Sequence, residues 1–132
     1  MDADTIITFE KHNVNVDAHN FEPIIKGMEM AVNATDGGTA RVARLDSIVV
    51  CGKTGTAQNS HGKDHSVFMA FAPKNNPRIA IAVLVENAGF GATWAAPIAS
   101  LMIEKYLKGN IAPQRQWLED RISNAVILPN TQ

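Results

Sequence analysis

The segment Val49–Gln58 has the sequence VVCGKTGTAQ, in which a short apolar run leads into a lysine, two threonines and a glycine. Thr54 and Thr56 are two residues apart, so on a strand their hydroxyls project from the same face. Gly55 between them has no Cβ, which lets another backbone approach closely. Lys53 adds a cation with three donors, suited to holding a carboxylate or tuning a nearby hydroxyl. The segment therefore predicts a strand whose edge can receive an extended peptide by strand addition.

The tripeptide at 52–54, GKT, could also close a phosphate-binding loop of the form G-x-x-x-x-G-K-[ST]. The first glycine of that loop would fall at position 47, which is Ser47. The apolar residues after it predict a strand over 48–53, where the loop needs flexible backbone. A helix should follow the threonine, yet Gly55 and a polar run come next. Nucleotide binding is therefore poorly supported at this segment.

The chain has 132 residues, the size of one domain or of part of one. Its 45% hydrophobic content can build a core, and its net charge of −1 gives no indication of a nucleic-acid or membrane-surface partner. No apolar run reaches the roughly 18 residues of a transmembrane helix, and the acidic start MDAD lacks the basic region of a signal peptide. The single cysteine, Cys51, excludes an internal disulfide, and the histidines at 12, 19, 61 and 65 are not at metal-ligand spacing. We expect no metal and no cofactor.

The first part of the chain predicts one clear helix. Apolar alternation over 5–16 favours an extended segment or a loose hairpin. Asn20 is a candidate N-cap, and the helical spacing of residues such as Met28 and Val32 predicts an amphipathic helix over 21–32.

Three strands are predicted after that helix. The K-T-G strand at 48–56 is followed by strands at Ser66–Ala72 and Arg78–Glu86, and the short turn between these two predicts antiparallel pairing. Both faces of the last strand are apolar, so we expect both faces of the sheet to be covered. Four alanines would let a helix lie close against the sheet: Ala70, Ala72, Ala80 and Ala82.

A helix over 93–108 is expected to cover the sheet. Thr93 is its candidate cap, Pro97 falls in or near its first turn, and Gly109 follows its end. A last short helix is predicted over 115–122, docking through Trp117, Leu118 and Ile122. The sequence thus predicts an α+β fold, an antiparallel sheet of about three strands packed by helices.

The K-T-G tripeptide is one of three motifs shared by penicillin-binding proteins and serine β-lactamases, together with S-x-x-K and S-D-N. The longer string GKTGTAQ at 52–58 resembles the transpeptidase form of this motif. Gly38-Thr39-Ala40-Arg41 resembles the Gly-Thr-Ala segment upstream of K-T-G in elongation-type class B penicillin-binding proteins. The order of elements over about residues 20–110 is similar to the last third of their transpeptidase domain. The chain therefore resembles a C-terminal fragment of such a domain, with a partial penicillin-binding-protein/β-lactamase-like fold.

This resemblance implies a D,D-transpeptidase that cross-links peptidoglycan stem peptides through an acyl-serine intermediate and that penicillin acylates. It implies that Lys53 is catalytic, through the electrostatics of the site, and that the Thr54 and Thr56 hydroxyls bind the carboxylate of substrate or antibiotic. Gly55 would belong to the same substrate-binding strand, and the Thr56 N–H would supply half of an oxyanion hole. We expect the three side chains of 53, 54 and 56 to line one rim of a groove. The implied ligands of the parent protein are the D-Ala-D-Ala stem peptide and β-lactams, with no nucleic acid.

The nucleophile of that family is not found in this sequence. The one S-x-x-K match, Ser60-His61-Gly62-Lys63, lies in a polar run just after K-T-G, and S-x-N does not occur. The first two strands and the helical half of the family's domain would precede residue 1, in a membrane-anchored parent with an extracytoplasmic transpeptidase domain. We therefore expect this fragment to be inactive alone, and to self-associate through sheet edges that the absent strands would cover.

Two other functions stay open from the sequence. A serine β-lactamase-like fragment would share K-T-G, although Gly38-Thr39-Ala40 and the continuation Thr56-Ala57-Gln58 favour the transpeptidase. A non-catalytic module could instead use the Thr54–Thr56 edge to bind peptides without chemistry.

Overall fold

The computed structural model describes residues 10 and 12–127, which form one three-stranded antiparallel sheet with helices. The helices are α1 (Phe21–Asn33), α2 (Ala95–Lys108) and α3 (Gln116–Ser123), and the strands are β1 (Cys51–Ala57), β2 (His65–Ala72) and β3 (Ile79–Val85). Short 3-10 turns are η1 (Ala18–Asn20), η2 (Arg41–Ala43) and η3 (Pro113–Arg115). The predicted sheet of three strands packed by helices is confirmed. No helix in this part of the chain has the length and apolarity needed to cross a membrane.

The element boundaries differ most from prediction at the start of β1. The strand expected from residue 48 begins at Cys51. Just before it, the Val49 carbonyl oxygen accepts a 2.8 Å hydrogen bond from the Lys74 N–H, and the Val50 carbonyl oxygen accepts a 2.7 Å bond from the Asn33 side chain. The helix expected from 93 begins at Ala95. The extended segment or hairpin predicted over 5–16 lies partly outside the described residues, and residues 12–16 form no strand.

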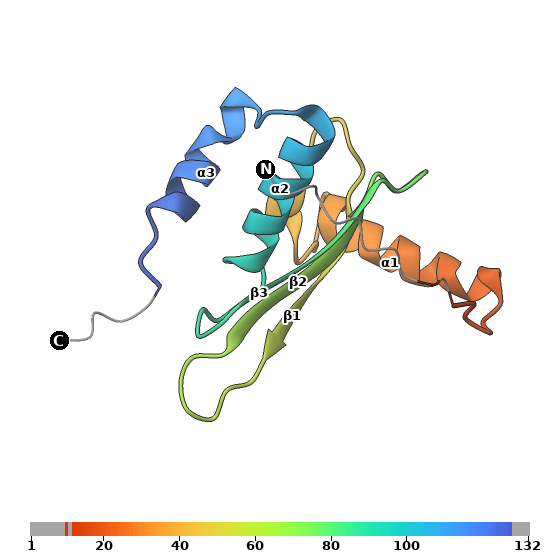
Figure 1. Ribbon diagram of the computed structural model, residues 1–132, viewed down its shortest axis with the longest axis horizontal. Helices are drawn as coiled ribbons and strands as arrows, with labels where there is room; N and C mark the ends of the chain where they lie inside the picture. The colour runs from red at the N-terminus through yellow and green to blue at the C-terminus, as the bar shows by residue number, and fades with distance from the viewer. Residues whose placement is uncertain (1–9, 11, 128–132) are drawn as a thin grey trace.

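The sheet lies between two unequal layers, with α2 and α3 on one side and α1 on the other (Figure 1). Alternation along β2 produces this separation. Phe68, Ala70 and Ala72 are buried in the core that α2 completes with Ala95, Ala96, Ala99 and Ile103. A Cβ at Gly52 would overlap the Phe68 ring, so the glycine before K-T-G makes room for this side chain. We call the side of the sheet that packs on α2 the closed face, and the opposite side the open face.

The prediction that both faces are covered is wrong within the described residues. On the open face Met69 is 54% exposed and Leu84 is 59% exposed. Of the four alanines expected to seat a helix, Ala70 and Ala72 do so, whereas Ala80 and Ala82 lie exposed on the open face. Apolar alternation indicates that a face can be buried, but it does not supply an element that covers it.

The start of α2 is capped from the sheet. Thr93 is not its cap, because the helix begins after Trp94 and no side chain at the N-cap bonds to it. Instead, the buried Ser66 hydroxyl on β2 accepts a 3.1 Å hydrogen bond from the Ala95 N–H and donates a 2.9 Å bond to the Phe90 carbonyl oxygen. One strand hydroxyl thus satisfies an end group of the helix and fixes the preceding loop. Gly109, with φ +81°, ends α2 as predicted.

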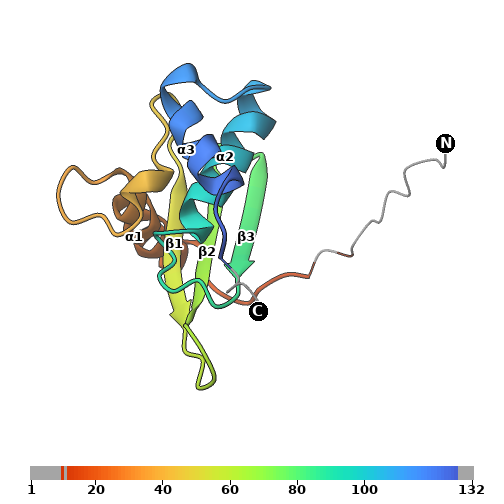
Figure 2. The same cartoon turned by 90° about the vertical axis from the view of Figure 1, so that its left-hand side faces the viewer.

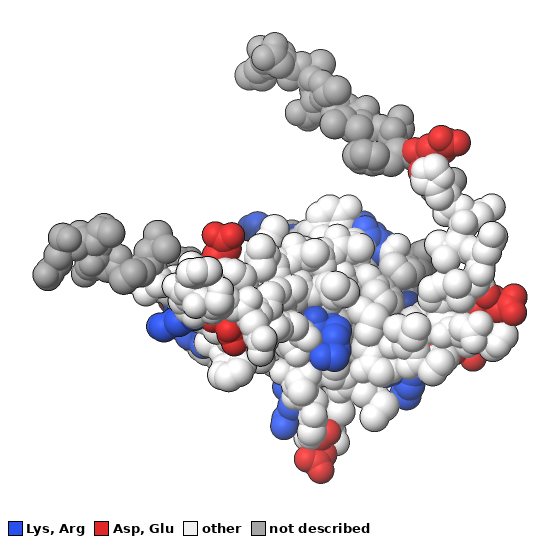
Figure 3. All heavy atoms as spheres, turned by 90° about the horizontal axis from the view of Figure 1, so that it is seen from below, with Lys and Arg blue, Asp and Glu red and all other residues white. Residues whose placement is uncertain are grey.

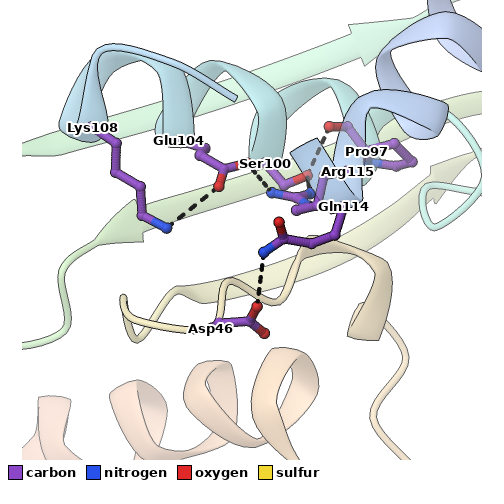
Figure 4. Close-up of polar contacts among 7 residues, drawn as sticks. All are labelled: Asp46, Pro97, Ser100, Glu104, Lys108, Gln114 and Arg115. Carbon is purple, nitrogen blue, oxygen red and sulfur yellow. Dashed lines mark hydrogen bonds and ion pairs between the residues drawn. The ribbon is translucent and has the colours of Figure 1, made fainter. Parts of the chain in front are cut away.

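The C-terminal segment is held on α2 by a buried polar network (Figure 4). Glu104 is buried on α2, and its carboxylate accepts a 2.7 Å bond from the Arg115 guanidinium. Arg115 also donates to the Ser100 hydroxyl at 2.7 Å, and Lys108 lies 3.4 Å from Glu104. A buried carboxylate requires such partners. Leu118 of α3 is buried as expected, but Trp117 is 60% exposed and does not dock.

Candidate functional site

The K-T-G tripeptide lies on β1, an edge strand of the described sheet (Figure 2). Thr54 and Thr56 lie opposite alternate residues of β2, so their side chains share a face, as predicted. Lys53 lies opposite Met69 and therefore belongs to the open face. Lys53 and Thr56 are exposed and Thr54 is half-buried. The three side chains are therefore accessible, but they do not all point the same way.

The Gly-Thr-Ala segment is held directly beside this strand. Gly38 lies against the last turn of α1, where a Cβ would come within 3.0 Å of the Ala31 carbonyl oxygen. The Ala40 N–H donates a 2.8 Å bond to that same oxygen. Thr39 between them has its hydroxyl 3.4 Å from the Thr54 hydroxyl. Close packing at Gly38 and the Ala40 bond therefore bring Thr39 to the K-T-G strand.

A groove of about 560 Å³ runs between α1 and the open face of the sheet. Lys53 and Met69 line it from the strands, Thr39 and Asp36 line it from the loop after α1, and α1 contributes mainly apolar side chains. Gly55 and Thr56 are not among its lining residues. Three residues were predicted to line one rim. Lys53 lines this groove, and Thr54 does not line it but contacts Thr39, which does. Thr56 lies outside the groove.

Lys53 has no acidic partner in the described part of the chain, since no Asp or Glu oxygen lies within 4.0 Å of its Nζ. Its ammonium instead donates a 2.9 Å bond to the Thr54 carbonyl oxygen. Charged side chains are scattered singly over a mostly uncharged surface in the view of Figure 3. An exposed ammonium without a carboxylate nearby can bind an anionic group of a ligand.

The loop before α2 packs against the back of the K-T-G strand. Gly91 is buried, and a Cβ there would overlap the Val67 carbonyl oxygen and lie 2.7 Å from the Gly55 carbonyl oxygen. The role of this loop in supporting β1 depends on contacts between residues about 36 positions apart in the chain, such as Gly55 and Gly91, which no local pattern reveals.

Two other groups at or near the strand do not match the nucleophile of the S-x-x-K motif. Ser60 of the S-x-x-K match lies in the turn of the β1–β2 hairpin, exposed and bonded at 2.9 Å to its neighbour His61. It does not open a helix. Cys51 is buried, and burial raises the pKa of its thiol, which disfavours the reactive thiolate.

Some lining residues were not singled out as site residues from the sequence. Thr39 was noted only as part of the Gly-Thr-Ala segment, and its contact with Thr54 explains why that segment accompanies K-T-G. Asp36 and Met69 carried no motif signal. They reach the groove because α1 and the sheet pack together.

Residues 4–104 match the family described as the penicillin binding protein transpeptidase domain. The peptidoglycan D,D-transpeptidase MrdA of Haemophilus influenzae is 39% identical over 103 residues, which cover 66% of this chain and 16% of that protein. The protein of the same name from Acinetobacter baumannii is 32% identical over 127 residues, which cover 82% of this chain and 19% of that protein. The chain thus spans less than a fifth of the length of these curated relatives.

Among solved structures, Pseudomonas aeruginosa PBP2 in complex with WCK 5153 superimposes with a TM-score of 0.64 at 35% identity. The likeness covers 77% of this chain and 23% of that one. It confirms the penicillin-binding-protein fold, and the relatives confirm the resemblance to part of a class B protein. Because the family match spans the Gly-Thr-Ala segment, the K-T-G strand and the two strands after it, the chain belongs to the penicillin-binding protein transpeptidase domain family.

Proposed function

We propose that this chain contributes the K-T-G strand to the active site of a peptidoglycan D,D-transpeptidase. The observation that carries the proposal is the exposed ammonium of Lys53 on an edge strand, beside Thr54 and Thr39 and without an acidic partner among the described residues. The relatives that bear the name peptidoglycan D,D-transpeptidase support the same reaction.

The reaction proposed for the whole protein proceeds in two steps. A serine hydroxyl attacks the carbonyl carbon of the penultimate D-Ala of a stem peptide, the bond to the terminal D-Ala breaks, and that residue leaves with the proton on its amine. An amine of a second stem peptide then attacks the resulting ester, which forms the cross-link and returns the proton to the serine. A β-lactam would acylate the same serine as its ring amide opens.

Within this scheme Lys53 stabilises negative charge and the Thr54 and Thr56 hydroxyls bind the carboxylate of the stem peptide or the β-lactam. Gly55 leaves room for the substrate backbone, and the Thr56 N–H donates to the carbonyl oxygen as it becomes an oxyanion. The attacking serine would come from an S-x-x-K helix that these 132 residues do not contain. The domain would work on the extracytoplasmic side of a membrane to which the parent protein is anchored, because its peptidoglycan substrate lies there.

The test uses the intact protein that contains this chain, labelled with a fluorescent penicillin. Lys53→Ala should slow acylation by about 10²-fold or more, the scale of losing a preorganised electrostatic group. Lys63→Ala is the matched control, since this lysine is exposed on the hairpin turn and should label at the wild-type rate. Equal labelling of the Lys53→Ala variant and the wild type would contradict the proposed role.

The 132-residue chain alone should take up no label, because members of a catalytic unit lose nearly all activity when the nucleophile is absent. A labelled band that disappears with Ser60→Ala would instead identify Ser60 as a nucleophile and overturn the proposal. Far-UV circular dichroism of both proteins would establish that they are folded.

The two alternatives predict different outcomes. A β-lactamase would hydrolyse penicillin over many turnovers of the intact protein, whereas a transpeptidase would remain acylated. A peptide-binding module would give a calorimetric signal when the isolated chain is titrated with a D-Ala-D-Ala peptide, and that signal would fall with Thr54→Val. We expect long-lived acylation of the intact protein and no such signal from the isolated chain.

A further inference from the structure

The chain that leaves the K-T-G strand is joined to the loop after β3 by a pair of side-chain amides. β1 ends at Ala57, and Asn59 follows it in the connection to β2. The Asn59 side-chain amide donates a 2.7 Å hydrogen bond to the side-chain oxygen of Asn87, which lies just after β3. Both side chains are half-buried, and the two segments lie at the same end of the sheet (Figure 1). We call Asn59 and Asn87 the amide clasp.

Further bonds fix the backbone on each side of the amide clasp. The Asn59 N–H donates a 3.2 Å bond to the Asp64 carboxylate, and the Asn59 side-chain oxygen accepts a 3.0 Å bond from the His61 N–H. The Asn87 N–H donates a 3.0 Å bond to Nδ1 of His65. Asn87 has φ +54°, in the left-handed region where asparagine is enriched. The clasp therefore joins two side chains whose backbones are already held in place.

The loop after β3 also supports the strand that pairs with β1. In β2, residues 65–67 lie opposite residues 55–57 of β1. The Gly89 N–H donates a 2.7 Å bond to the Asp64 carbonyl oxygen, just before β2. A Cβ at Gly91 would overlap the backbone of both strands. The loop is thus packed on the paired strands, and the amide clasp adds a direct bond from it to the chain beyond β1.

We propose that Asn59 and Asn87 are positioning residues of the transpeptidase, a role that rests on the function proposed above. The Thr56 N–H is the donor assigned to the oxyanion hole, and Asn59 lies three residues after it. The clasp fixes the point where the chain leaves β1 and so limits movement of the Thr56 backbone. Acyl-transfer rates depend steeply on where an oxyanion donor lies. Both asparagines act through the strand and not through contact with the substrate.

Loss of the clasp should slow acylation more than it weakens penicillin binding. The hydroxyls of Thr54 and Thr56 can rotate to follow a carboxylate, whereas the Thr56 N–H moves only with the backbone. Displacing this N–H weakens an interaction that becomes strong only in the transition state. The expected signature is a lower first-order acylation constant with a nearly unchanged dissociation constant for the noncovalent complex.

The first experiment measures both constants for the intact protein that contains this chain, from labelling time courses at several concentrations of a fluorescent penicillin. Asn87→Gly removes the acceptor of the clasp but keeps the left-handed backbone and the N–H that bonds to His65. It should lower the acylation constant by about tenfold. Asn76→Gly is the matched control, because Asn76 also has a left-handed φ, +55°, and is exposed in the turn at the other end of the sheet. It should acylate at the wild-type rate.

The second experiment tests whether the two asparagines act through one bond. Asn59→Ala removes the donor and should give a loss similar to that of Asn87→Gly. The double variant Asn59→Ala/Asn87→Gly should be no slower than the slower single variant, since one bond can be lost only once. Asn87→Asp keeps an oxygen acceptor for the Asn59 amide and should recover most of the loss. Each time course is followed to completion, so that only protein competent to react contributes to the constants.

Losses that multiply in the double variant, or an equal loss in Asn76→Gly, would overturn the proposal. So would a weaker noncovalent complex with an unchanged acylation constant. Lys53→Ala in the same assay separates this proposal from the proposed function. If Lys53→Ala is slow and Asn87→Gly labels at the wild-type rate, only the clasp proposal fails. If Lys53→Ala itself labels at the wild-type rate, the proposed function fails.

Discussion

Phe68 and Met69 are neighbours on β2 and point to opposite faces of the sheet, where they meet different surroundings. Phe68 is 0% exposed, enclosed by Gly52 and the alanines of α2, whereas Met69 is 54% exposed beside Lys53. Their sequence contexts do not predict this difference, because both are large apolar residues in an alternating strand. The closed face holds most of the buried core, and the open face presents the groove and its lysine.

The two faces separate the buried core from the groove, although the edge-strand residues Thr54 and Thr56 lie opposite Phe68 and Ser66 and so belong to the closed face. Burial on the closed face removes apolar surface from water, which is the main favourable contribution to folding. The open face keeps apolar surface accessible, and contiguous surface of this kind commonly marks a contact site. Mutations on the two faces should therefore have separate effects, and the following measurements test that separation.

The largest expected effect is the contrast between Phe68→Ala and Met69→Ala. Removing the buried ring should lower the free energy of unfolding by about 3–5 kcal/mol, because it deletes core contacts and leaves a cavity. Removing the exposed Met69 side chain should cost less than about 1 kcal/mol. Urea denaturation of the two variants measures both values. Similar losses would mean that the open face is buried in solution.

The next largest effect is expected at the buried ion pair between Arg115 and Glu104, which holds the C-terminal segment on α2. Arg115→Met leaves the Glu104 carboxylate buried with only Lys108 nearby, at 3.4 Å. We expect a loss of about 3 kcal/mol, at the low end for a broken buried pair because one cation remains. The double variant Arg115→Met/Glu104→Leu should recover much of this loss, as measured by chemical denaturation. No recovery would indicate that Arg115 stabilises α3 by packing and not by compensating the buried charge.

A smaller effect is expected at Ser66, the closed-face hydroxyl that caps α2. Ser66→Ala should cost about 1 kcal/mol, the usual value of an N-cap side chain. Ser60→Ala in the exposed hairpin turn is the matched control and should leave the unfolding midpoint unchanged. Thermal unfolding of both variants gives the comparison, and equal midpoints for the two would show that the Ala95 N–H finds another acceptor.

The smallest effect is expected at α1, which contacts the turn after β2 through an ion pair between Glu29 and Lys74. Glu29 accepts 2.9 Å bonds from Lys74 and Lys26, and these bonds, Lys74 first, lower the pKa of its carboxyl below the usual 4.5. A lowered folded pKa means that this stabilisation is present above pH 4.5 and is lost as the pH falls through the folded pKa. Glu29→Gln should thus be less stable than wild type at neutral pH, and the difference should vanish well below pH 4.5. A difference that persists in acid would exclude the ion pairs as its cause.

The strands, α1 and α2 were largely predictable because their signals are local. The helical spacing around Met28 and Val32, the alternation over 66–86 and the glycine after Lys108 each depend on a few neighbouring residues. The cap of α2 was predicted wrongly at Thr93. The hydroxyl that accepts the bond from the Ala95 N–H belongs to Ser66, which is 29 residues before Ala95 in the chain. The bond from the Lys74 N–H to the Val49 carbonyl oxygen, just before β1, is equally non-local.

The sequence by itself determined the periodicity of each element, the K-T-G and Gly-Thr-Ala motifs, and the shared face of Thr54 and Thr56. These follow from backbone geometry, which repeats every two residues in a strand and every 3.6 in a helix. Only the tertiary structure decided which face of the sheet is closed within the described residues, and that Lys53 lines a groove beside α1 while Thr56 does not. Burial and pairing depend on which distant segments come to lie against a residue, and a residue's own neighbours in sequence do not specify that.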